Sequence, residues 1–317
     1  MRDIKLLSIV VPCHNEEEVL NATNKRLRDV LNGLVNDKKT STFEIVYVDN
    51  GSTDNTLNVL KDIYDSSKNI KIIALRRNFG YQGSISAGLY YAKGDAVITI
   101  DADLQDPPEK IGEMIQLYEN GYDLVLGVRN DRSTDSFLKK IFSESYYNIL
   151  KLFGVEVVHN HGDFRLMAKG LVDIFNSLPE RNRFIRAMIL QLDSKYAVVH
   201  YKREKRIAGK TKFNISSLLS FSIDGIVSFS YMPLRLASLV GFILCFLSMI
   251  GVLWVLYIKL YSRSLVPGWA STLLPIFFIG GFQLLVLGIV GEYIGKLYIE
   301  IKQRPLFIVR EVYRHDR

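Results

Sequence analysis

The sequence predicts an α/β domain with a mostly parallel sheet, followed by interfacial helices and two transmembrane helices. In residues 1–200, short apolar runs rich in β-branched residues alternate with helix-compatible stretches. Strands of this kind are typical of parallel sheets that helices cover on both faces. Further along, residues 236–258 and 264–291 contain no charged side chain. Each of these stretches is long enough for one helix to cross a hydrocarbon core of about 30 Å.

The composition excludes several classes of protein. Of the 317 residues, 48% are apolar and 23% are charged, which excludes a disordered chain. The 22 glycines and 8 prolines exclude a collagen-like repeat, and the two cysteines cannot build a disulfide framework. The net charge of +7 leaves nucleic acid, an anionic membrane surface and phosphate-bearing substrates open as partners.

The strand and helix pattern places a binding site at one edge of the predicted sheet. The expected strands cover residues 7–11, 43–48, 70–75, 96–100 and 122–128, with helices that include 17–35, 54–65 and 84–92. Ligands of such sheets bind beyond the carboxyl ends of the strands. Polar and acidic residues gather at three of those ends, in the segments 12–16, 49–52 and 101–106. We therefore expect the functional site there.

The acidic turn after the fourth strand predicts a metal site. Asp101 and Asp103 follow this strand, and Pro107 and Pro108 prevent its continuation, so that both carboxylates are able to converge. Oxygen ligands of this kind bind Mg²⁺ or Mn²⁺. The alternative is an acidic cap on the helix that begins near Pro107, a role that Asp106 alone could fill.

The expected domain boundaries are 1–212 for the α/β domain, 213–232 for interfacial helices and 233–317 for a two-span membrane anchor with a C-terminal tail. Residues 213–232 are apolar with interleaved Ser and Asn, as in helices that lie on a membrane surface. The alternatives are an ordinary packed helix for this segment and buried core helices for the two spans. Lys and Arg are frequent before the spans and after residue 295 but sparse in the connector 259–269, which predicts that both termini are cytoplasmic.

Seven motifs resemble a known family. Three are similar to those of family 2 glycosyltransferases with the GT-A fold, a Rossmann-like α/β fold: VVPCHNEEE at 10–18, VDNGSTDN at 48–55 and DADLQDP at 101–107. Four more narrow the resemblance to the polyprenyl-phosphate glycosyltransferases: RNDRSTD at 129–135, GDFRLM at 162–167, PERN at 179–182 and RIAGKTKF at 206–213. This group is related to dolichyl-phosphate mannose synthase, and its bactoprenol glucosyltransferases of O-antigen modification resemble the chain most.

The resemblance implies a metal-dependent, inverting hexosyltransferase of the bacterial inner (plasma) membrane. It would move glucose from UDP-glucose to undecaprenyl phosphate on the cytoplasmic leaflet, for O-antigen (lipopolysaccharide) or other cell-envelope glycosylation. UDP-4-formamido-arabinose, UDP-N-acetylglucosamine and GDP-mannose are alternative donors, and a non-catalytic scaffold or a lipid flippase component is the alternative of a different class. The implied cofactor is Mg²⁺ or Mn²⁺, and the implied partners are the donor, the acceptor lipid, the membrane and further copies of the chain in a homotetramer, without nucleic acid.

Site residues are carried over position by position. The resemblance implies that the donor is bound by Pro12, His14, Glu16, Val48, Asp49, Asn50, Asp101, Ala102 and Asp103. The implied metal ligands are Asp101, Asp103 and Gln105. The implied acceptor- and phosphate-binding residues are Arg129, Lys139, Ser143, Arg206 and Lys212. Two positions depart from the family, which commonly has Asp where Asn50 stands and often Tyr or Phe where His14 stands.

The charge pattern agrees with two phosphate groups meeting in one site. Residues 202–212 supply six positive charges, which bind these phosphates, attract the chain to anionic lipid, or do both. Lys139 and Ser143 are four residues apart and would share one helix face. His159 and His161 are expected to be surface-loop histidines, with metal binding as the alternative.

Asp163 is the implied catalytic residue. A phosphate nucleophile is mostly deprotonated at pH 7, so there is little proton for a base to remove. Asp163 is therefore expected either as a base or as an electrostatic or orienting group that acts on Arg165 or Lys139. An acid that satisfies backbone donors in a loop is the structural alternative.

Overall fold

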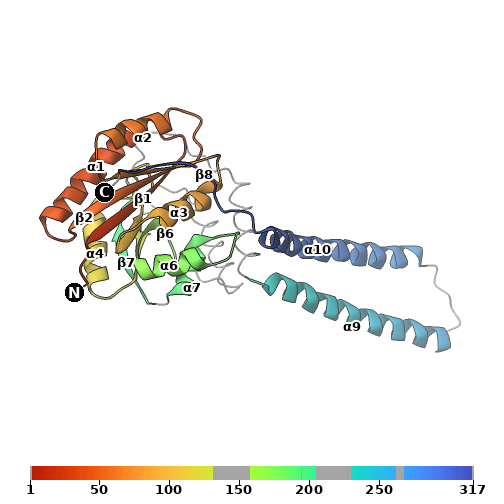
Figure 1. Cartoon of the computed structure of the whole chain (residues 1–317). Coiled ribbons are helices and arrows are strands. Elements are labelled where there is room, and N and C mark those ends of the chain that lie inside the picture. Colours follow the sequence, from red (N-terminus) through yellow and green to blue (C-terminus); the bar gives the residue numbers. More distant parts are fainter. Residues whose placement is uncertain are drawn as a thin grey trace. The chain divides into compact units, whose positions relative to one another are not determined.

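A computed structural model describes residues 2–130, 158–193, 195–204, 227, 230–261 and 268–315 of the chain (Figure 1). The chain divides into two compact units. The first comprises Met1–Asn148, Glu156–Asn214 and Arg304–Arg317, and the second comprises Ile149–Val155 and Ile215–Gln303. The C-terminal residues therefore belong to the same unit as the N-terminal ones.

The first unit is built on a mixed sheet. Within the described residues it has eight strands in the order β7-β5-β6-β4-β1-β2-β3-β8. Their bounds are β1 Leu6–Cys13, β2 Thr42–Asp49, β3 Ile70–Leu75, β4 Ala96–Thr99, β5 Leu124–Arg129, β6 His161–Ala168, β7 Tyr196–Tyr201 and β8 Val309–Tyr313. Only β6 and β8 run against the other described strands, because β6 pairs antiparallel with β4 and β5, and β8 pairs antiparallel with β3. The predicted α/β class with a mostly parallel sheet is confirmed.

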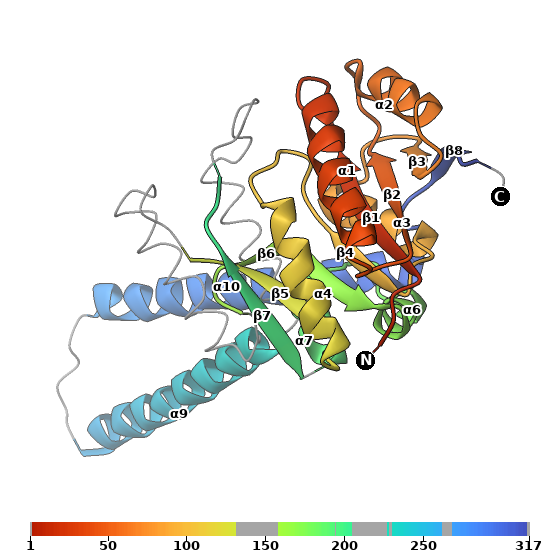
Figure 2. The same cartoon turned by 90° about the vertical axis from the view of Figure 1, so that its left-hand side faces the viewer.

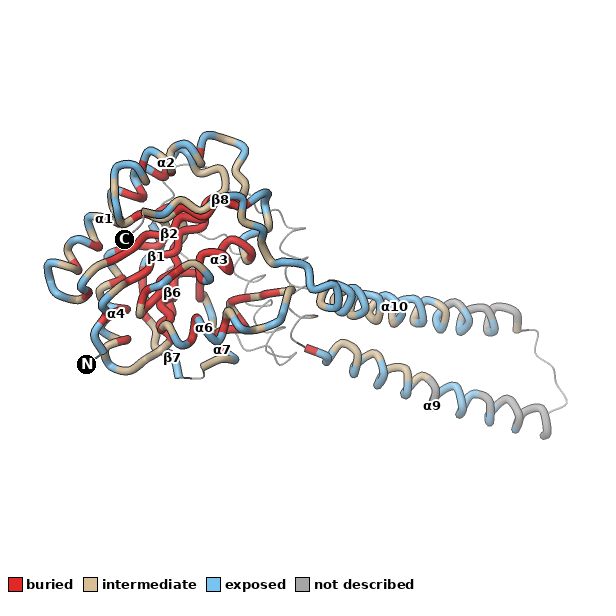
Figure 3. Tube along the Cα trace, viewed as in Figure 1, coloured by how far each residue is buried: buried red, intermediate tan, exposed pale blue. Residues whose placement is uncertain are grey.

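Helices cover both faces of this sheet. Their bounds are α1 Leu20–Asn36, α2 Thr56–Asp65, α3 Gly80–Tyr91, α4 Ile111–Glu119, α6 Lys169–Ser177 and α7 Ile185–Leu192, with a 3₁₀ turn at Pro108–Lys110. Figures 1 and 2 show α1, α2 and α4 on one face and α3, α6 and α7 on the other. The strand residues are therefore enclosed on both sides, and buried positions follow the strands in Figure 3.

The side-chain alternation of the strands decides which helix each residue meets. Ile9 belongs to the core cluster shared with α1, α2 and α4, whereas its neighbour Val10 faces α3. Gly88 on α3 lets this helix approach closely, since a Cβ there would lie 2.2 Å from Cγ1 of Val10. The five predicted strands are present with small shifts at their ends, but β6, β7 and β8 were not predicted.

The second unit contains the two predicted apolar helices, α9 (Met232–Tyr261) and α10 (Trp269–Lys302). Met232–Gly251 and Phe278–Lys302 have mean hydropathies of 2.1 and 1.6, so that both are long and apolar enough to cross a membrane. Large apolar side chains lie on the outside of both helices, and Phe242 and Leu284 are each 71% exposed. Most of 213–232, the predicted interfacial segment, lies outside the described residues.

The segment after α10 returns to the first unit. Strand β8 pairs with β3, and the backbone N–H of Arg76 donates to the carbonyl oxygen of Ile308 at 2.9 Å. His315 stacks on Tyr64 with ring centroids 4.0 Å apart. The tail is therefore an edge strand of the N-terminal sheet.

Candidate active site

The predicted site segments come together at one edge of the sheet. In the parallel pair β1–β2, Cys13 lies opposite Asp49, and in the pair β1–β4, Val10 lies opposite Thr99. The segments that begin at His14, Asn50 and Asp101 therefore leave neighbouring strands at the same edge. This confirms the expected convergence of polar segments at the carboxyl ends of the strands.

Strand β6 reaches this edge of the sheet with its amino end, whereas β1, β2 and β4 reach it with their carboxyl ends. Because β6 is antiparallel to β4, its first residues lie beside the last residues of β4, with Thr99 opposite Arg165. The Thr99 hydroxyl donates to the backbone carbonyl oxygen of Asp163. The antiparallel strand thus carries Asp163 to the edge that holds the acidic turn.

The acidic turn is tightly folded. Leu104 adopts a left-handed conformation with φ of 56°, and the backbone N–H of Gln105 donates to Oδ1 of Asp103 at 3.1 Å. The Thr23 hydroxyl on α1 holds the turn by donating to the carbonyl oxygen of Ala102 at 2.6 Å. Tyr81 on α3 donates its hydroxyl to Oδ1 of Asp101 at 2.6 Å. The turn is therefore fixed by helices on both faces of the sheet.

Negative charge accumulates in this turn. Burial, together with the negative charges of Asp106 and Asp163, raises the pKa of Asp101 to about 7. One carboxylate oxygen of Asp106, Oδ2, is buried and has no hydrogen-bond partner among the described residues. A buried group of carboxylates with an excess of negative charge and an oxygen atom without a hydrogen-bond donor is suited to bind a cation.

The residues present fit a divalent metal ion that is shared with a substrate. Within the described ranges, no group of three or more His, Cys, Asp or Glu side chains is arranged to hold a metal ion. Mg²⁺ commonly takes only one or two carboxylates and completes its coordination with substrate phosphates and water. Asp101 and Asp103 supply such a pair, whereas the Gln105 side-chain oxygen accepts a hydrogen bond from Arg203.

Asp106 anchors a second cluster that sequence reasoning missed. Its Oδ1 accepts hydrogen bonds from the Tyr201 hydroxyl at 2.6 Å and from Nη2 of Arg129 at 3.2 Å. Burial lowers the pKa of Arg129, but the negative charge of Asp106 outweighs it and the pKa is raised. The alternative that Asp106 caps the following helix is wrong, because the cap position of the 3₁₀ turn is Pro107 and no side chain caps it. The same acidic turn therefore also positions the predicted phosphate-binding Arg129.

Asp163 is held by two arginines. It forms an ion pair with Arg165 on the same strand, and its Oδ2 lies 2.6 Å from Nη2 of Arg186 on α7. Burial opposes ionisation of Asp163, but the charges of Arg186 and Arg165 outweigh it and hold its pKa well below the usual range. The ionised form of the side chain is therefore favoured, and it pairs with two arginines. Arg186 was not predicted as a site residue, because its contact with Asp163 depends on how α7 packs against β6.

His161 differs from its predicted surface position. It is the first residue of β6 and only 5% exposed, and neither ring nitrogen has a hydrogen-bond partner among the described residues. Burial and the charges of Arg165 and Arg186 lower its pKa to about 3. The prediction was wrong because it placed His161 in a surface loop before Gly162, whereas β6 begins at His161. His159, by contrast, is exposed as expected.

The segments after β1 and β2 are joined by hydrogen bonds. The backbone N–H of Glu16 donates to the Thr56 hydroxyl at 2.9 Å, and the backbone N–H of Ser52 donates to Oδ1 of Asp49 at 3.1 Å. Among the other predicted donor-binding residues, Pro12 and Val48 lie opposite one another in β1 and β2, where both are buried. These contacts shape the edge where the nucleotide is expected.

His14 and Asn50, the two departures from the family pattern, are linked through Asn78. Nδ2 of Asn50 donates to Oδ1 of Asn78 at 3.1 Å, and Nδ2 of Asn78 lies 3.0 Å from Nε2 of His14. Asn78 follows β3 and was not predicted as a site residue. Sequence reasoning had no pattern to find it, because its role depends on contacts with two other segments.

Four of the predicted acceptor- and phosphate-binding residues lie outside the described residues: Lys139, Ser143, Arg206 and Lys212. The structure therefore brings together the donor set, the acidic turn, Arg129 and Asp163. The roles of these residues in binding and catalysis stay predictions.

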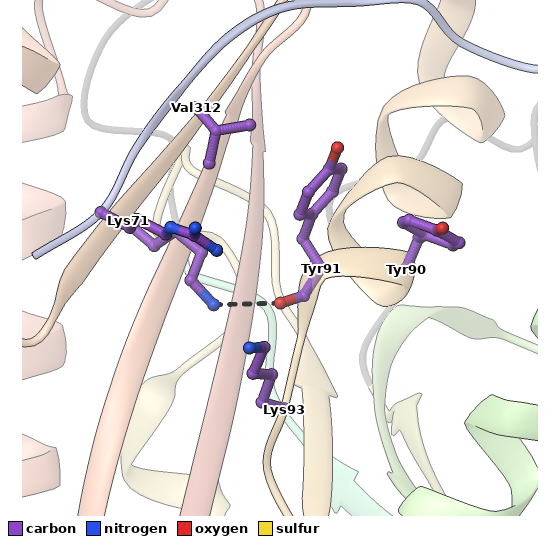
Figure 4. A pocket seen from close by; sticks show the side chains of 6 residues that line it. Lys71, Tyr90, Tyr91, Lys93 and Val312 are labelled. Atoms are coloured by element: carbon purple, nitrogen blue, oxygen red, sulfur yellow. Dashed lines mark hydrogen bonds between the residues drawn. The ribbon is translucent and has the colours of Figure 1, made fainter. Parts of the chain in front are cut away.

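A separate cavity lies at the opposite edge of the sheet (Figure 4). It has a volume of about 290 Å³ and is lined by Lys71, Tyr90, Tyr91, Lys93, Val312 and Arg314. Nζ of Lys71 donates to the carbonyl oxygen of Tyr91 at 3.0 Å and pairs with Glu44 at 2.9 Å. Lys71 is near the start of β3 and Lys93 precedes β4, so that the cavity borders the amino ends of these strands. It contains none of the predicted site residues.

Comparison with known proteins gives a consistent result. The family model described as Glycosyl transferase family 2 matches residues 8–175. An uncharacterized glycosyltransferase of Bacillus subtilis, YkcC, is 40% identical over 307 residues, which are 96% of this chain and 94% of that protein. A prophage bactoprenol glucosyl transferase homolog of Escherichia coli is 38% identical over 307 residues, 96% of this chain and 99% of that protein.

One solved structure matches part of the chain. It is a mannosyltransferase of Pyrobaculum calidifontis in complex with GDP-Man and Mn²⁺. The two chains are 14% identical with a TM-score of 0.47, and the match covers 71% of this chain and 63% of that structure, less than two thirds of its length.

Proposed function

Because the chain belongs to glycosyl transferase family 2, we propose that it transfers a hexose from a nucleotide sugar to a polyprenyl phosphate, with inversion at the sugar. The observation that carries the proposal is the single sheet edge where Asp101 and Asp103 lie near an arginine-rich cluster around Asp163. Relatives named bactoprenol glucosyl transferase, 38% identical over nearly the whole chain, favour UDP-glucose as donor and undecaprenyl phosphate as acceptor.

The acidic turn would hold the metal ion and the donor diphosphate. Asp101 and Asp103 would bind Mg²⁺ or Mn²⁺, which as a Lewis acid stabilises the departing diphosphate. Tyr81 orients the Asp101 carboxylate through its hydrogen bond, and Thr23 fixes the backbone that carries both acids. The chain therefore contributes a rigid pair of oxygen ligands on a buried turn.

Positive side chains would accept the second phosphate. The donor diphosphate and the lipid phosphate are both anionic, and a phosphate monoester carries a charge of about −1.5 to −2 at pH 7. Arg129 is fixed by Asp106 and Tyr201 at the end of β5, and its side chain is 24% exposed. Lys139, Ser143, Arg206 and Lys212 would complete this set.

Asp163 would act electrostatically. A carboxylate whose pKa lies well below its usual range is a weak base. A lipid phosphate needs no base at neutral pH, because it is already ionised. Asp163 would instead orient Arg165 and Arg186 and stabilise positive charge that develops on the sugar.

The chain would work as a multi-pass protein of the bacterial inner membrane. Helices α9 and α10 would be its two spans, which suits an acceptor that is itself a membrane lipid. Since β1 and β8 are strands of one sheet, the chain must cross the membrane an even number of times between them. The catalytic unit and both termini would then be cytoplasmic, in a homo-oligomer in which glycines of α10 allow close helix packing.

The test is transfer by the purified protein. Labelled UDP-glucose, undecaprenyl phosphate and Mg²⁺ or Mn²⁺ should yield a labelled lipid with a β-linked sugar if the UDP-glucose is the usual α anomer. A panel with UDP-4-formamido-arabinose, UDP-N-acetylglucosamine and GDP-mannose identifies the donor. If no donor of the panel is transferred to the lipid, the chain is a scaffold or a flippase component instead.

A further inference from the structure

The side-chain amides of Asn50 and Asn78 have fixed orientations. The backbone N–H of Phe79 donates to Oδ1 of Asn50 at 2.9 Å, and the backbone N–H of Gly80 donates to Oδ1 of Asn78 at 2.7 Å. A backbone N–H is only a donor, so the side-chain atom that it meets must be the amide oxygen. In both residues Nδ2 therefore faces the other partners as a donor.

These orientations determine where the hydrogen of His14 lies. Nδ2 of Asn78 is 3.0 Å from Nε2 of His14. Because Nδ2 is the donor in this contact, Nε2 must be the unprotonated acceptor. The neutral imidazole then carries its hydrogen on Nδ1.

Asn50 begins this chain of hydrogen bonds. Its Nδ2 donates to Oδ1 of Asn78 and to the carbonyl oxygen of Gly80, both at 3.1 Å. Both hydrogens of the Asn50 amide are therefore used inside the loop, and neither is left to donate to a nucleotide. An aspartate at position 50 has no hydrogen to donate and would face two oxygen atoms. The residue at position 50 and the tautomer of His14 thus depend on one another through Asn78.

We infer that Asn50 and Asn78 are positioning residues that hold His14 as the Nδ1–H tautomer, and that this fixed ring sets how the site binds the nucleoside diphosphate of the donor. The inference rests on the proposed function, since it assigns a task within the same site. In this tautomer Nε2 accepts from Asn78, and the hydrogen that the ring can donate is fixed on Nδ1. Asn50 and His14 are thus coupled through Asn78.

The sharpest variant is Asn78→Asp. It keeps the oxygen that accepts from Gly80 and Asn50 and replaces only the donor that faces His14 with an acceptor. His14 must then place a hydrogen on Nε2 to keep the contact. The matched control is Asn58→Asp, which makes the same chemical change on the exposed side of α2, where the amide donates to Oδ1 of Asn55 at 2.7 Å.

The readout is ¹⁵N NMR of the histidine rings in the full-length protein in detergent, with UDP as the binding probe. A His14→Gln variant identifies the His14 resonances among those of the five histidines. In the unsubstituted protein we expect Nδ1 protonated and Nε2 unprotonated. Asn78→Asp should move the hydrogen to Nε2 and weaken UDP binding by about tenfold, the scale of one lost hydrogen bond. Asn58→Asp should change neither.

The outcomes separate this inference from the proposed function. A wild-type His14 protonated on Nε2 would overturn the inference whether or not the enzyme transfers a sugar, and this measurement does not depend on Asn78→Asp being folded. A switched tautomer with unchanged UDP affinity would also overturn it. Absence of transfer by a wild-type protein that shows the Nδ1–H tautomer would instead overturn the proposed function.

Discussion

Asp163 and Arg165 lie two residues apart on β6 and form a buried ion pair between side chains on the same face of the strand. Arg165 is fully buried, at 0% exposure, and Asp163 is 3% exposed. A buried pair of this kind is stable only when both charges keep their partners. Arg186 adds a second cation to the same carboxylate, so that Asp163 is part of a fixed charge cluster at the site.

Replacement of Asp163 by asparagine should lower kcat at least about tenfold, an effect of ~1.4 kcal/mol on the barrier. The pKa of Asp163 is depressed, so the pair with its arginines stabilises the fold above about pH 4 and is lost only as the pH falls through the folded-state value. Between pH 5 and 9 the carboxylate does not change charge. The pH–rate profile of the variant should therefore keep its shape and drop uniformly. A variant that regains rate at high pH would show that Asp163 is a base, and thermal unfolding checks that the variant is folded.

Asp101→Asn and Asp103→Asn should each abolish turnover while the protein stays folded and in the membrane. The physical reason is the loss of a charged oxygen ligand for the divalent ion. EDTA should stop the wild-type reaction, and added Mg²⁺ or Mn²⁺ should restore it. Asp62→Asn, on the exposed side of α2, is the control and should keep full activity. Undiminished turnover in EDTA would contradict the metal assignment.

Tyr201→Phe should raise the KM for the lipid acceptor more than it lowers kcat. The change removes the hydroxyl that donates to Asp106 and accepts from Arg129. Arg129 then loses one of its hydrogen bonds, and the free energy of unfolding should fall by about 1–3 kcal/mol for the two lost hydrogen bonds. Acceptor kinetics and thermal unfolding measure the two effects. An unchanged acceptor KM in a destabilised variant would show that the cluster only supports the fold.

Deletion of residues 304–317 should destabilise the catalytic unit although it leaves both apolar helices intact. The deletion removes β8 and exposes the edge of β3, which favours edge-to-edge association. We expect membrane insertion to persist, with a lower thermal midpoint and greater aggregation in detergent. Deletion of residues 316–317 alone, which keeps β8, is the control. Equal stability of the two truncated proteins would mean that β8 is dispensable.

Local patterns in the sequence were sufficient to predict many of the strands and helices of this protein and part of its candidate site. Five strands, the helices between them and the two apolar helices each follow from hydrophobic periodicity or the absence of charge within one stretch. The position of Asp101 and Asp103 at a strand end follows in the same way, because the carboxyl ends of parallel strands share one edge of the sheet.

The tertiary structure decided the rest, because it depends on pairings between distant segments. Strand β6 enters the sheet antiparallel between β4 and β5, and only this pairing brings Asp163 to the acidic turn. Strand β8 lies beside β3 after an intervening pair of long helices. Arg186 and Asn78 contact residues that are distant in the sequence, and no periodicity or spacing of residues in the sequence indicates these contacts. The sequence by itself determined which chemical groups stand at each strand end, whereas the order and direction of the strands determined which of those groups meet.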